Sequence, residues 1–222
     1  MTDKTIGKAT ETSFENHILT LTLNRPEKKN AINQEMAEEL LLGFERARTD
    51  PEVRVVVVAA RGDVFCAGGD LSMMAQQQAE GSKPFGGGIA EIALKVRGVC
   101  KPVIVKAQGP VLAGSLLIVC NATHVVAADD IYFSLPEIKR GLFPFMVMAG
   151  LLRLVPQRLA LDWAMRGYKI SAAEAKSWGL INQNVPREEL DAAVDALAQE
   201  IASYSPATIR LGLEAFHGQE NL

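Results

Sequence analysis

The sequence is short of cysteine and contains neither a cluster of basic residues nor a long apolar run. Its three cysteines, Cys66, Cys100 and Cys120, are an odd number without CxxC spacing, which fits a reducing compartment better than a disulfide framework. The formal net charge is −3, whereas binding to nucleic acid or to a membrane surface needs clustered Lys and Arg. No apolar run approaches the roughly 20 residues of a membrane span. We therefore expect a cytoplasmic protein with no nucleic-acid and no membrane partner.

Metal-ligand spacings and a targeting signal are also missing. His17, His124 and His217 are scattered and share no spacing typical of metal ligands. Residues 1–16 are polar, lack the apolar core of a signal peptide, and are expected either to fray or to pair at a sheet edge. The sequence therefore predicts no metal, and we expect no prosthetic group.

The apolar pattern changes near residue 140 and divides the chain into two regions. Residues 17–23 alternate as in a half-buried strand, whereas 53–60 and 102–108 are continuously apolar, as in strands covered on both faces. We predict an α/β fold in which residues 1–140 form the core and residues 141–222 a mostly helical region, together one continuous unit. The expected helices are 34–49 after an Asn33 cap, 70–74, 89–98, one from about Gly114, 145–154, 156–166, 171–177 and 187–204, with short strands at 124–129, 131–135 and 180–185 and a mobile loop at 76–88.

Two glycine-containing turns each follow a buried strand and precede a helix. They are CAGGD at 66–70 and the GPVLAG part of AQGPVLAGS at 107–115. Glycine lets a ligand approach the backbone closely, and the first N–H groups of a helix have no partner within it. Two such units can aim two N–H groups at one oxygen atom, which is the arrangement of an oxyanion hole.

Glu137 is the best candidate for a base to accompany such a hole. It lies in FSLPEIKRGLFP, between apolar Leu135 and Ile138, where partial desolvation would raise the pKa of its carboxyl group toward a range useful for proton transfer. The alternative is a structural ion pair with Lys139 or Arg140. Two other reactive groups have simpler interpretations: we expect Asp70 to cap a helix and Cys66 to pack rather than to act as a nucleophile.

Five segments together resemble the crotonase superfamily, the enoyl-CoA hydratases and isomerases, over about residues 17–217. They are LNRPEKKNAIN (23–33), FCAGGDL (65–71), KPVIVKAQGPVLAGS (101–115), LPEIKRGLFP (135–144) and SAAEAKSWGLINQNVP (171–186). The resemblance implies a crotonase-like spiral of β-β-α turns, followed by a helical C-terminal region that builds a homotrimer or a dimer of trimers. Family members usually continue for some tens of residues beyond the point where this chain stops, so we expect either a missing or a shortened tail.

The resemblance also assigns roles to residues. It implies that an acyl-CoA thioester is the substrate, with coenzyme A as part of it, and that the backbone N–H groups of Gly69 and Gly114 bind the thioester oxygen. It places Lys28 or Lys29 near a phosphate of coenzyme A. The substrate-binding residues implied in this way are Lys28, Lys29, Asn30, Ala31, Ala67, Gly68, Asp70, Leu71 and Leu117.

One departure from the family pattern bears on the reaction. Hydratases of the family use two glutamates, the first three residues after the oxyanion glycine, and here Leu117 stands at that position while Glu137 occupies the second. The family's GGG is also changed, to Ala113-Gly114-Ser115. One base with an oxyanion hole is similar to the arrangement in the family's isomerases, and the resemblance then implies that Glu137 removes a proton from C2 of a 3-enoyl thioester and returns it at C4. The alternatives are a hydratase that recruits another carboxylate such as Glu91, a thioester hydrolase or decarboxylase, and a non-catalytic acyl-CoA binder.

Overall fold

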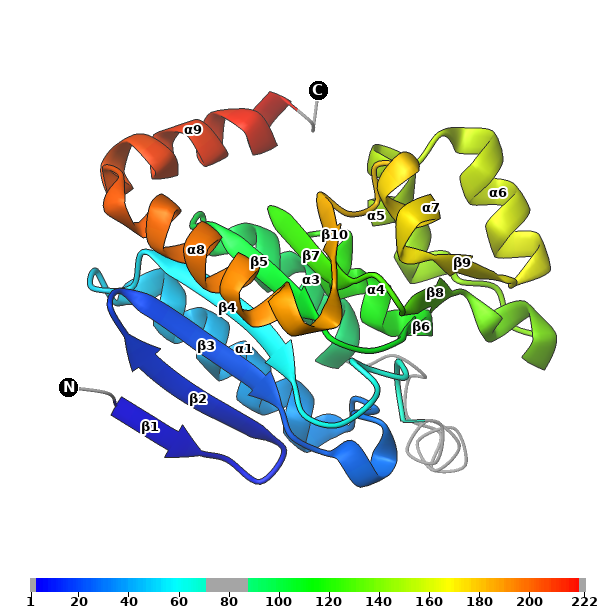
Figure 1. The fold of residues 1–222 in the computed structure, drawn as a ribbon, viewed down its shortest axis with the longest axis horizontal. Helices are drawn as coiled ribbons and strands as arrows, with labels where there is room; N and C mark the ends of the chain where they lie inside the picture. The colour runs from blue at the N-terminus through cyan, green and yellow to red at the C-terminus, as the bar shows by residue number, and fades with distance from the viewer. Residues whose placement is uncertain (1–2, 71–87, 220–222) are drawn as a thin grey trace.

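The computed structural model describes residues 3–70 and 88–219, and it is built on one large sheet and one small sheet (Figure 1). The large sheet has the strand order β1-β2-β3-β4-β5-β7-β10. The polar lead-in pairs at the sheet edge, as one of the two expectations had it, and from β3 onward neighbouring strands are parallel. Its strands are β1 (Asp3–Ile6), β2 (Thr10–Glu15), β3 (Ile18–Leu23), β4 (Val55–Ala60), β5 (Val103–Ala107), β7 (His124–Ala128) and β10 (Gln183–Val185).

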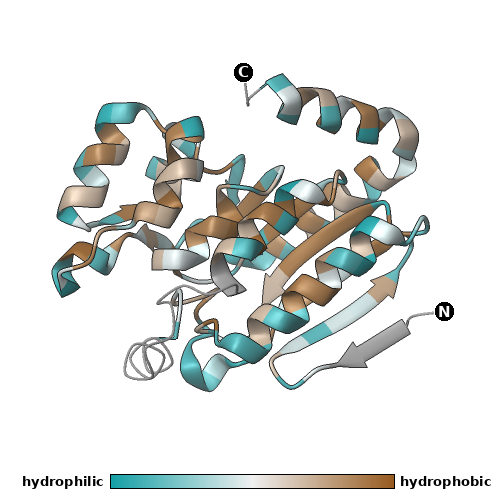
Figure 2. Ribbon diagram, turned by 180° about the vertical axis from the view of Figure 1, so that it is seen from behind, coloured by the Kyte–Doolittle hydropathy of each residue, from teal (hydrophilic) through white to brown (hydrophobic). Residues whose placement is uncertain are grey.

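Helices cover both faces of the large sheet. Helices α1 (Gln34–Thr49) and α3 (Gly88–Gly98) lie behind it in Figure 1, and α8 (Leu190–Ser203) crosses in front of β3, β4, β5 and β7. All but the last residue of β4 are therefore buried, which is why this strand is continuously apolar instead of alternating. Figure 2 shows hydrophobic residues concentrated in the central strands, while α1 alternates between hydrophobic and hydrophilic positions.

The small sheet lies at the far end of the molecule from β1, with most of the remaining helices around it (Figure 1). It consists of β6 (Val111–Leu112), β8 (Tyr132–Ser134) and β9 (Lys169–Ser171), with β6 and β8 parallel. The helices of this end are α4 (Leu116–Val119), α5 (Phe145–Leu154), α6 (Gln157–Arg166) and α7 (Ala172–Ser177). Fully buried Trp163 links α6 to the end of α7, because it packs edge-on against Trp178 and donates from Nε1 to the carbonyl of Tyr168.

Short 3-10 turns and one last helix complete the described chain. The turns are η1 (Pro26–Lys28), η2 (Ala113–Ser115), η3 (Pro136–Arg140) and η4 (Arg187–Glu189). Helix α9 (Pro206–Gln219) leads away from α8 toward the C-terminus, and none of its residues is buried (Figure 1). No described helix is long and apolar enough to cross a membrane.

The local predictions are largely confirmed. Asn33 caps α1 by accepting a hydrogen bond from the N–H of Met36, and α5 has the predicted bounds. The predicted helix 187–204 is instead a 3-10 turn followed by α8, and the helix after Gly114 is a 3-10 turn followed by the single turn of α4. Strands β6 and β9 and helix α9 were not predicted. The expected helix 70–74 and loop 76–88 fall almost entirely outside the described residues.

Candidate active site

Three segments that are distant in sequence lie side by side at the ends of the central strands. Ala67 donates its N–H to the carbonyl of Lys29, Ile32 donates to Gly68, and Asp70 donates to Ile32, with N–O distances of 2.8–3.0 Å. On the other side of the 66–70 segment, Leu112 donates to the carbonyl of Cys66 at 3.0 Å. The segment 23–33, which contains the residues predicted to bind coenzyme A, therefore forms one hydrogen-bonded layer with the two glycine turns.

The two glycine turns touch each other at Gly68. This residue has a φ of 92°, and a Cβ atom built on it would lie 3.0 Å from the nitrogen of Gly114 and 3.1 Å from the carbonyl oxygen of Leu112. A second close approach explains Gly109, because a Cβ atom there would lie 2.2 Å from the carbonyl oxygen of Asp63. Backbone packing therefore requires a glycine at position 109 of the apolar run 107–118.

The N–H groups of Gly69 and Gly114 have no acceptor among the described residues. Gly69 pairs with Ile32 in an isolated parallel bridge whose hydrogen bonds are made by Gly68 and Asp70. In such a bridge the N–H of the central residue points away from the partner strand. Both groups are thus available to an outside acceptor, one from each turn.

Glu137 is brought to the same edge by the small sheet. Strands β6 and β8 are parallel, with Leu112 opposite Ser134, and Gly114 follows the first while Glu137 follows the second. Since the carboxyl ends of parallel strands meet at one edge, the glutamate and the glycine turn emerge together. Gly167, with a φ of 59°, holds the glutamate turn from the other side, because a Cβ atom there would lie 2.7 Å from the carbonyl oxygen of Leu135.

The carboxyl group of Glu137 is partly buried and incompletely bonded. Burial raises its pKa above the ordinary value, as the sequence predicted, while its own N–H and the positive charge of Arg140 oppose this shift. Its Oε2 atom is buried without a hydrogen-bond partner. The alternative ion pair with Lys139 or Arg140 is not found within the described part of the chain. A carboxyl group in this state binds a proton more readily than an exposed one.

The residues predicted to bind coenzyme A fall into two groups. Lys28 and Lys29 are exposed at the end of η1. Asn30 is fully buried with a φ of 51°, donates to the carbonyls of Arg61 and Val64, and accepts from the N–H of Arg25, each at 2.8 Å. Its side chain is therefore fully used in shaping the loop, and its own N–H donates to the carbonyl of Arg25 at 2.9 Å, so of the two residues only half-buried Ala31 is accessible from outside.

Asp70 has a partner, Arg25, that the sequence did not predict. Arg25 donates from Nη1 to the carbonyl of Ala31 at 2.6 Å and lies 3.4 Å from Oδ2 of Asp70. This arginine stands in the quoted LNRPE segment, but its pairing partner is 45 residues away, so no local signal reveals it. The helix that Asp70 was expected to cap, and Leu71 with it, lie outside the described residues.

The position of the family's first glutamate is apolar in structure as well as in sequence. Leu117 is 4% exposed within α4, and its carbonyl accepts a hydrogen bond from Asn121. Glu91, the alternative carboxylate, is exposed in the first turn of α3, a helix that packs against α4. Cys66 is fully buried, which raises the pKa of its thiol to about 12, so it is a packing residue and not a nucleophile.

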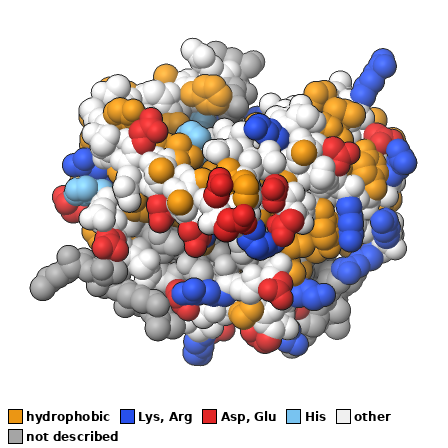
Figure 3. Space-filling model, in the orientation of Figure 1, with side chains coloured by type: hydrophobic (Ala, Val, Ile, Leu, Met, Phe, Trp, Pro, Cys, Tyr) orange, Lys and Arg blue, Asp and Glu red, His pale blue; other side chains and the backbone are white. Residues whose placement is uncertain are grey.

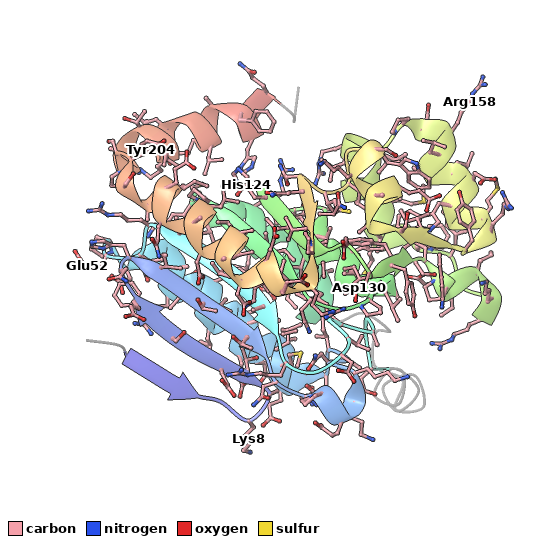
Figure 4. The ribbon with its side chains drawn as sticks, viewed as in Figure 1. Lys8, Glu52, His124, Asp130, Arg158 and Tyr204 are labelled. Carbon is pink, nitrogen blue, oxygen red and sulfur yellow. The ribbon has the colours of Figure 1, made fainter. Side chains whose placement is uncertain are left out.

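The remaining charged groups form no second candidate centre among the described residues. The described His, Cys, Asp and Glu side chains include no group of three or more able to hold a metal ion. His124 begins β7 and Asp130 lies just beyond its end (Figure 4). On the face drawn in Figure 3, acidic side chains gather near the middle and basic ones are spread around them, without a continuous basic patch.

Comparison with known proteins identifies the family. The protein-family model described as enoyl-CoA hydratase/isomerase matches residues 13–221. The chain is 34% identical over 207 residues to mevalonyl-coenzyme A hydratase sidH of Aspergillus fumigatus, covering 90% of this chain and 75% of that protein. It is 32% identical over 208 residues to enoyl-CoA hydratase EchA19 of Mycobacterium tuberculosis, covering 92% and 78%.

Solved structures agree. An enoyl-CoA hydratase from Mycobacterium smegmatis is 28% identical with a TM-score of 0.86, covering 100% of this chain and 83% of that one. Human enoyl coenzyme A hydratase domain-containing protein 3 is 27% identical with a TM-score of 0.89, covering 97% and 85%. The fold is thus that of a crotonase-fold protein. The chain belongs to the enoyl-CoA hydratase/isomerase family, as its motifs suggested.

Proposed function

We propose that the protein is an acyl-CoA-processing enzyme that isomerises 3-enoyl-CoA thioesters to their conjugated 2-enoyl forms. The observation that carries the proposal is the pairing of a half-buried Glu137, whose Oε2 atom has no partner, with buried Leu117 at the other family glutamate position. One carboxylate can shuttle one proton, whereas paired carboxylates are the family's means of adding water.

In this mechanism the thioester oxygen accepts hydrogen bonds from the N–H groups of Gly69 and Gly114. The carboxylate of Glu137 removes a proton from C2, and the electron pair moves into the dienolate, whose oxygen rests on the two N–H groups. The protonated Glu137 then returns the proton to C4, which leaves the double bond between C2 and C3. Each oxyanion donor is expected to lower the barrier by ~3 kcal/mol. General-base catalysis by Glu137 is expected to raise the rate by a factor of roughly 10²–10⁴.

Binding of the coenzyme A part is proposed for the exposed side of the same hydrogen-bonded layer. Lys28 and Lys29 are exposed and form no ion pair among the described residues, so their ammonium groups are available to phosphates. We further propose a homotrimer or a dimer of trimers. The support is that α9 carries Leu211 and Phe216, each 60% exposed, and has no buried residue.

A second candidate is hydration of a 2-enoyl thioester with Glu137 as the only carboxylate. It is favoured by the names of the relatives, since both the Aspergillus and the Mycobacterium proteins are called hydratases. In that case Glu137 would have to deprotonate water and also return a proton to C2. A second carboxylate such as Glu91 would remove this difficulty.

The deciding experiment supplies purified protein with a trans-3-enoyl-CoA and follows the ultraviolet absorbance of the conjugated thioester. We expect conjugation by the natural chain and a loss of at least 10²-fold in Glu137→Gln. Glu91→Gln is the matched control and should retain activity. Hydration of a 2-enoyl-CoA without isomerisation would favour the second candidate, and full activity of Glu137→Gln would refute both. Release of free coenzyme A, loss of carbon dioxide from a malonyl-type thioester, or binding without turnover would each replace the proposal by the corresponding alternative.

A further inference from the structure

Ser115 and Cys66 connect the two glycine turns from inside the protein. Ser115 is fully buried, and its Oγ atom donates to the carbonyl of Leu112 at 2.7 Å. Cys66 is also fully buried, its thiol lies next to the Ser115 side chain, and its Sγ atom accepts from the N–H of Gly68 at 3.4 Å. The two side chains therefore contact the backbone next to both proposed oxyanion donors.

The turn that Ser115 closes contains a strained residue. Ala113 has a φ of 54°, in the left-handed region that is unfavourable for a residue with a Cβ atom. The hydrogen bond from Ser115 to Leu112 spans Ala113 and Gly114, so it holds the chain in this conformation. Relaxation of Ala113 to an ordinary φ would rotate the peptide group that carries the N–H of Gly114.

We propose that Ser115 is a positioning residue whose hydroxyl group fixes the direction of the Gly114 N–H and, through Cys66, the turn that carries Gly69. The inference rests on the proposed use of these two N–H groups as an oxyanion hole. Ser115 does not touch the substrate in this scheme, because it is completely buried behind the turn. Its effect is exerted through the backbone of Leu112, Ala113 and Gly114.

A purely structural serine and a positioning serine have different kinetic signatures. Losing a buried hydrogen bond lowers stability, but it changes kcat only if the bond directs a group used in the transition state. An oxyanion exists after proton removal and not in the bound substrate, so misdirection of the Gly114 N–H should lower kcat while leaving KM nearly unchanged. Relieving the strain at Ala113 should then restore kcat without restoring the hydroxyl group.

The test compares Ser115→Ala, the double variant Ser115→Ala with Ala113→Gly, and a control, Thr10→Val. Thr10 is 2% exposed and its Oγ1 atom has no partner, so the control also removes a buried hydroxyl group. We expect kcat for conjugation to fall about 10–100-fold in Ser115→Ala, with KM within about twofold of the natural value. Most of the loss should be recovered in the double variant, since glycine adopts a positive φ without strain.

A second measurement does not depend on turnover. The thioester carbonyl of bound butanoyl-CoA is followed by difference infrared spectroscopy, where oxyanion-hole hydrogen bonds lower its stretching frequency relative to free solution. We expect this shift in the natural chain and in Thr10→Val, and a shift that is partly lost in Ser115→Ala. A shifted carbonyl band without conjugation of any 3-enoyl-CoA would defeat the proposed isomerase and leave the positioning role standing.

Two outcomes would overturn the inference. One is an unshifted carbonyl band in the natural chain, which would remove the oxyanion hole itself. The other is an unchanged kcat and an unchanged carbonyl band in Ser115→Ala. If Ser115→Ala does not fold, Cys66→Ala is measured in its place, because it removes the other end of the connection and is expected to change kcat and the band in the same direction.

Discussion

Substitution of Gly68 by alanine tests whether the two glycine turns really touch. The added Cβ atom would meet the Cβ of Ala113 at 2.8 Å, the nitrogen of Gly114 at 3.0 Å and the carbonyl oxygen of Leu112 at 3.1 Å. Ordinary contacts of a Cβ atom begin near 3.4 Å, so the turns must separate by about half an ångström. Two of the three atoms belong to the backbone, and no flexible side chain can move aside instead.

The expected magnitude has a conformational and a steric part. A φ of 92° is outside the regions that alanine adopts freely, which costs roughly 1–2 kcal/mol, and overpacking adds roughly 1–3 kcal/mol. The free energy of unfolding in urea should therefore fall by about 2–5 kcal/mol. A misplacement of about 1 Å lowers the rate roughly 10²-fold. A misplacement of about half an ångström should therefore lower kcat about tenfold in the protein that remains folded.

The control for this substitution is Gly98→Ala. Gly98 ends α3, its φ is not positive, and an added Cβ atom would meet nothing within 4 Å. This variant should keep its kcat, and its free energy of unfolding should rise by up to about 1 kcal/mol. If Gly68→Ala had the same free energy of unfolding and the same kcat as the natural chain, the contact between the turns would be refuted.

Two further predictions concern stability. Because burial raises the pKa of Glu137 above 4.5, its charged form opposes folding, so Glu137→Gln should be more stable than the natural chain at pH 7 and lose this gain below about pH 4, where the carboxyl group is protonated in both states. Urea unfolding at the two pH values measures this, and an equal gain at both would contradict it. Asn30→Ala leaves the carbonyls of Arg61 and Val64 and the N–H of Arg25 unpaired, so the free energy of unfolding should fall by roughly 2–4 kcal/mol. An unchanged denaturation midpoint in that variant would show that Asn30 does not hold the loop.

Features set by neighbouring residues were predictable, and features set by distant pairing were not. The Asn33 cap and the bounds of α5 follow from caps and periodicity within a few residues. Strands β6 and β9 have two and three residues, too few to show an alternating pattern, and they exist because β8 pairs with both. The sequence of α9 has a helical composition but buries nothing, so it carries little amphipathic signal.

The features of the candidate site also divide into those set by neighbouring residues, which were predictable, and those set by the tertiary fold, which were not. The glycine turns and the desolvation of Glu137 could be inferred from residues beside them in the chain. The contact of Gly68 with Gly114, the pairing of Arg25 with Asp70 and the internal role of Asn30 depend on the tertiary fold. The resemblance placed Asn30 near a ligand, whereas its side chain is entirely occupied by the loop that presents the neighbouring lysines.

The two proposed oxyanion donors, Gly69 and Gly114, lie in turns that follow strands of different sheets. The turn with Gly69 follows β4 of the large sheet, and the turn with Gly114 follows β6 of the small one. The distance between the donors therefore depends on how the two sheets are positioned relative to each other. The isolated bridge between Cys66 and Val111 is one of the contacts that fix this relative position. Loosening of the two-residue strand β6 would disable the proposed oxyanion hole while the seven-stranded sheet stayed folded, so the proposed chemistry depends on one of the smallest structural elements in the described chain.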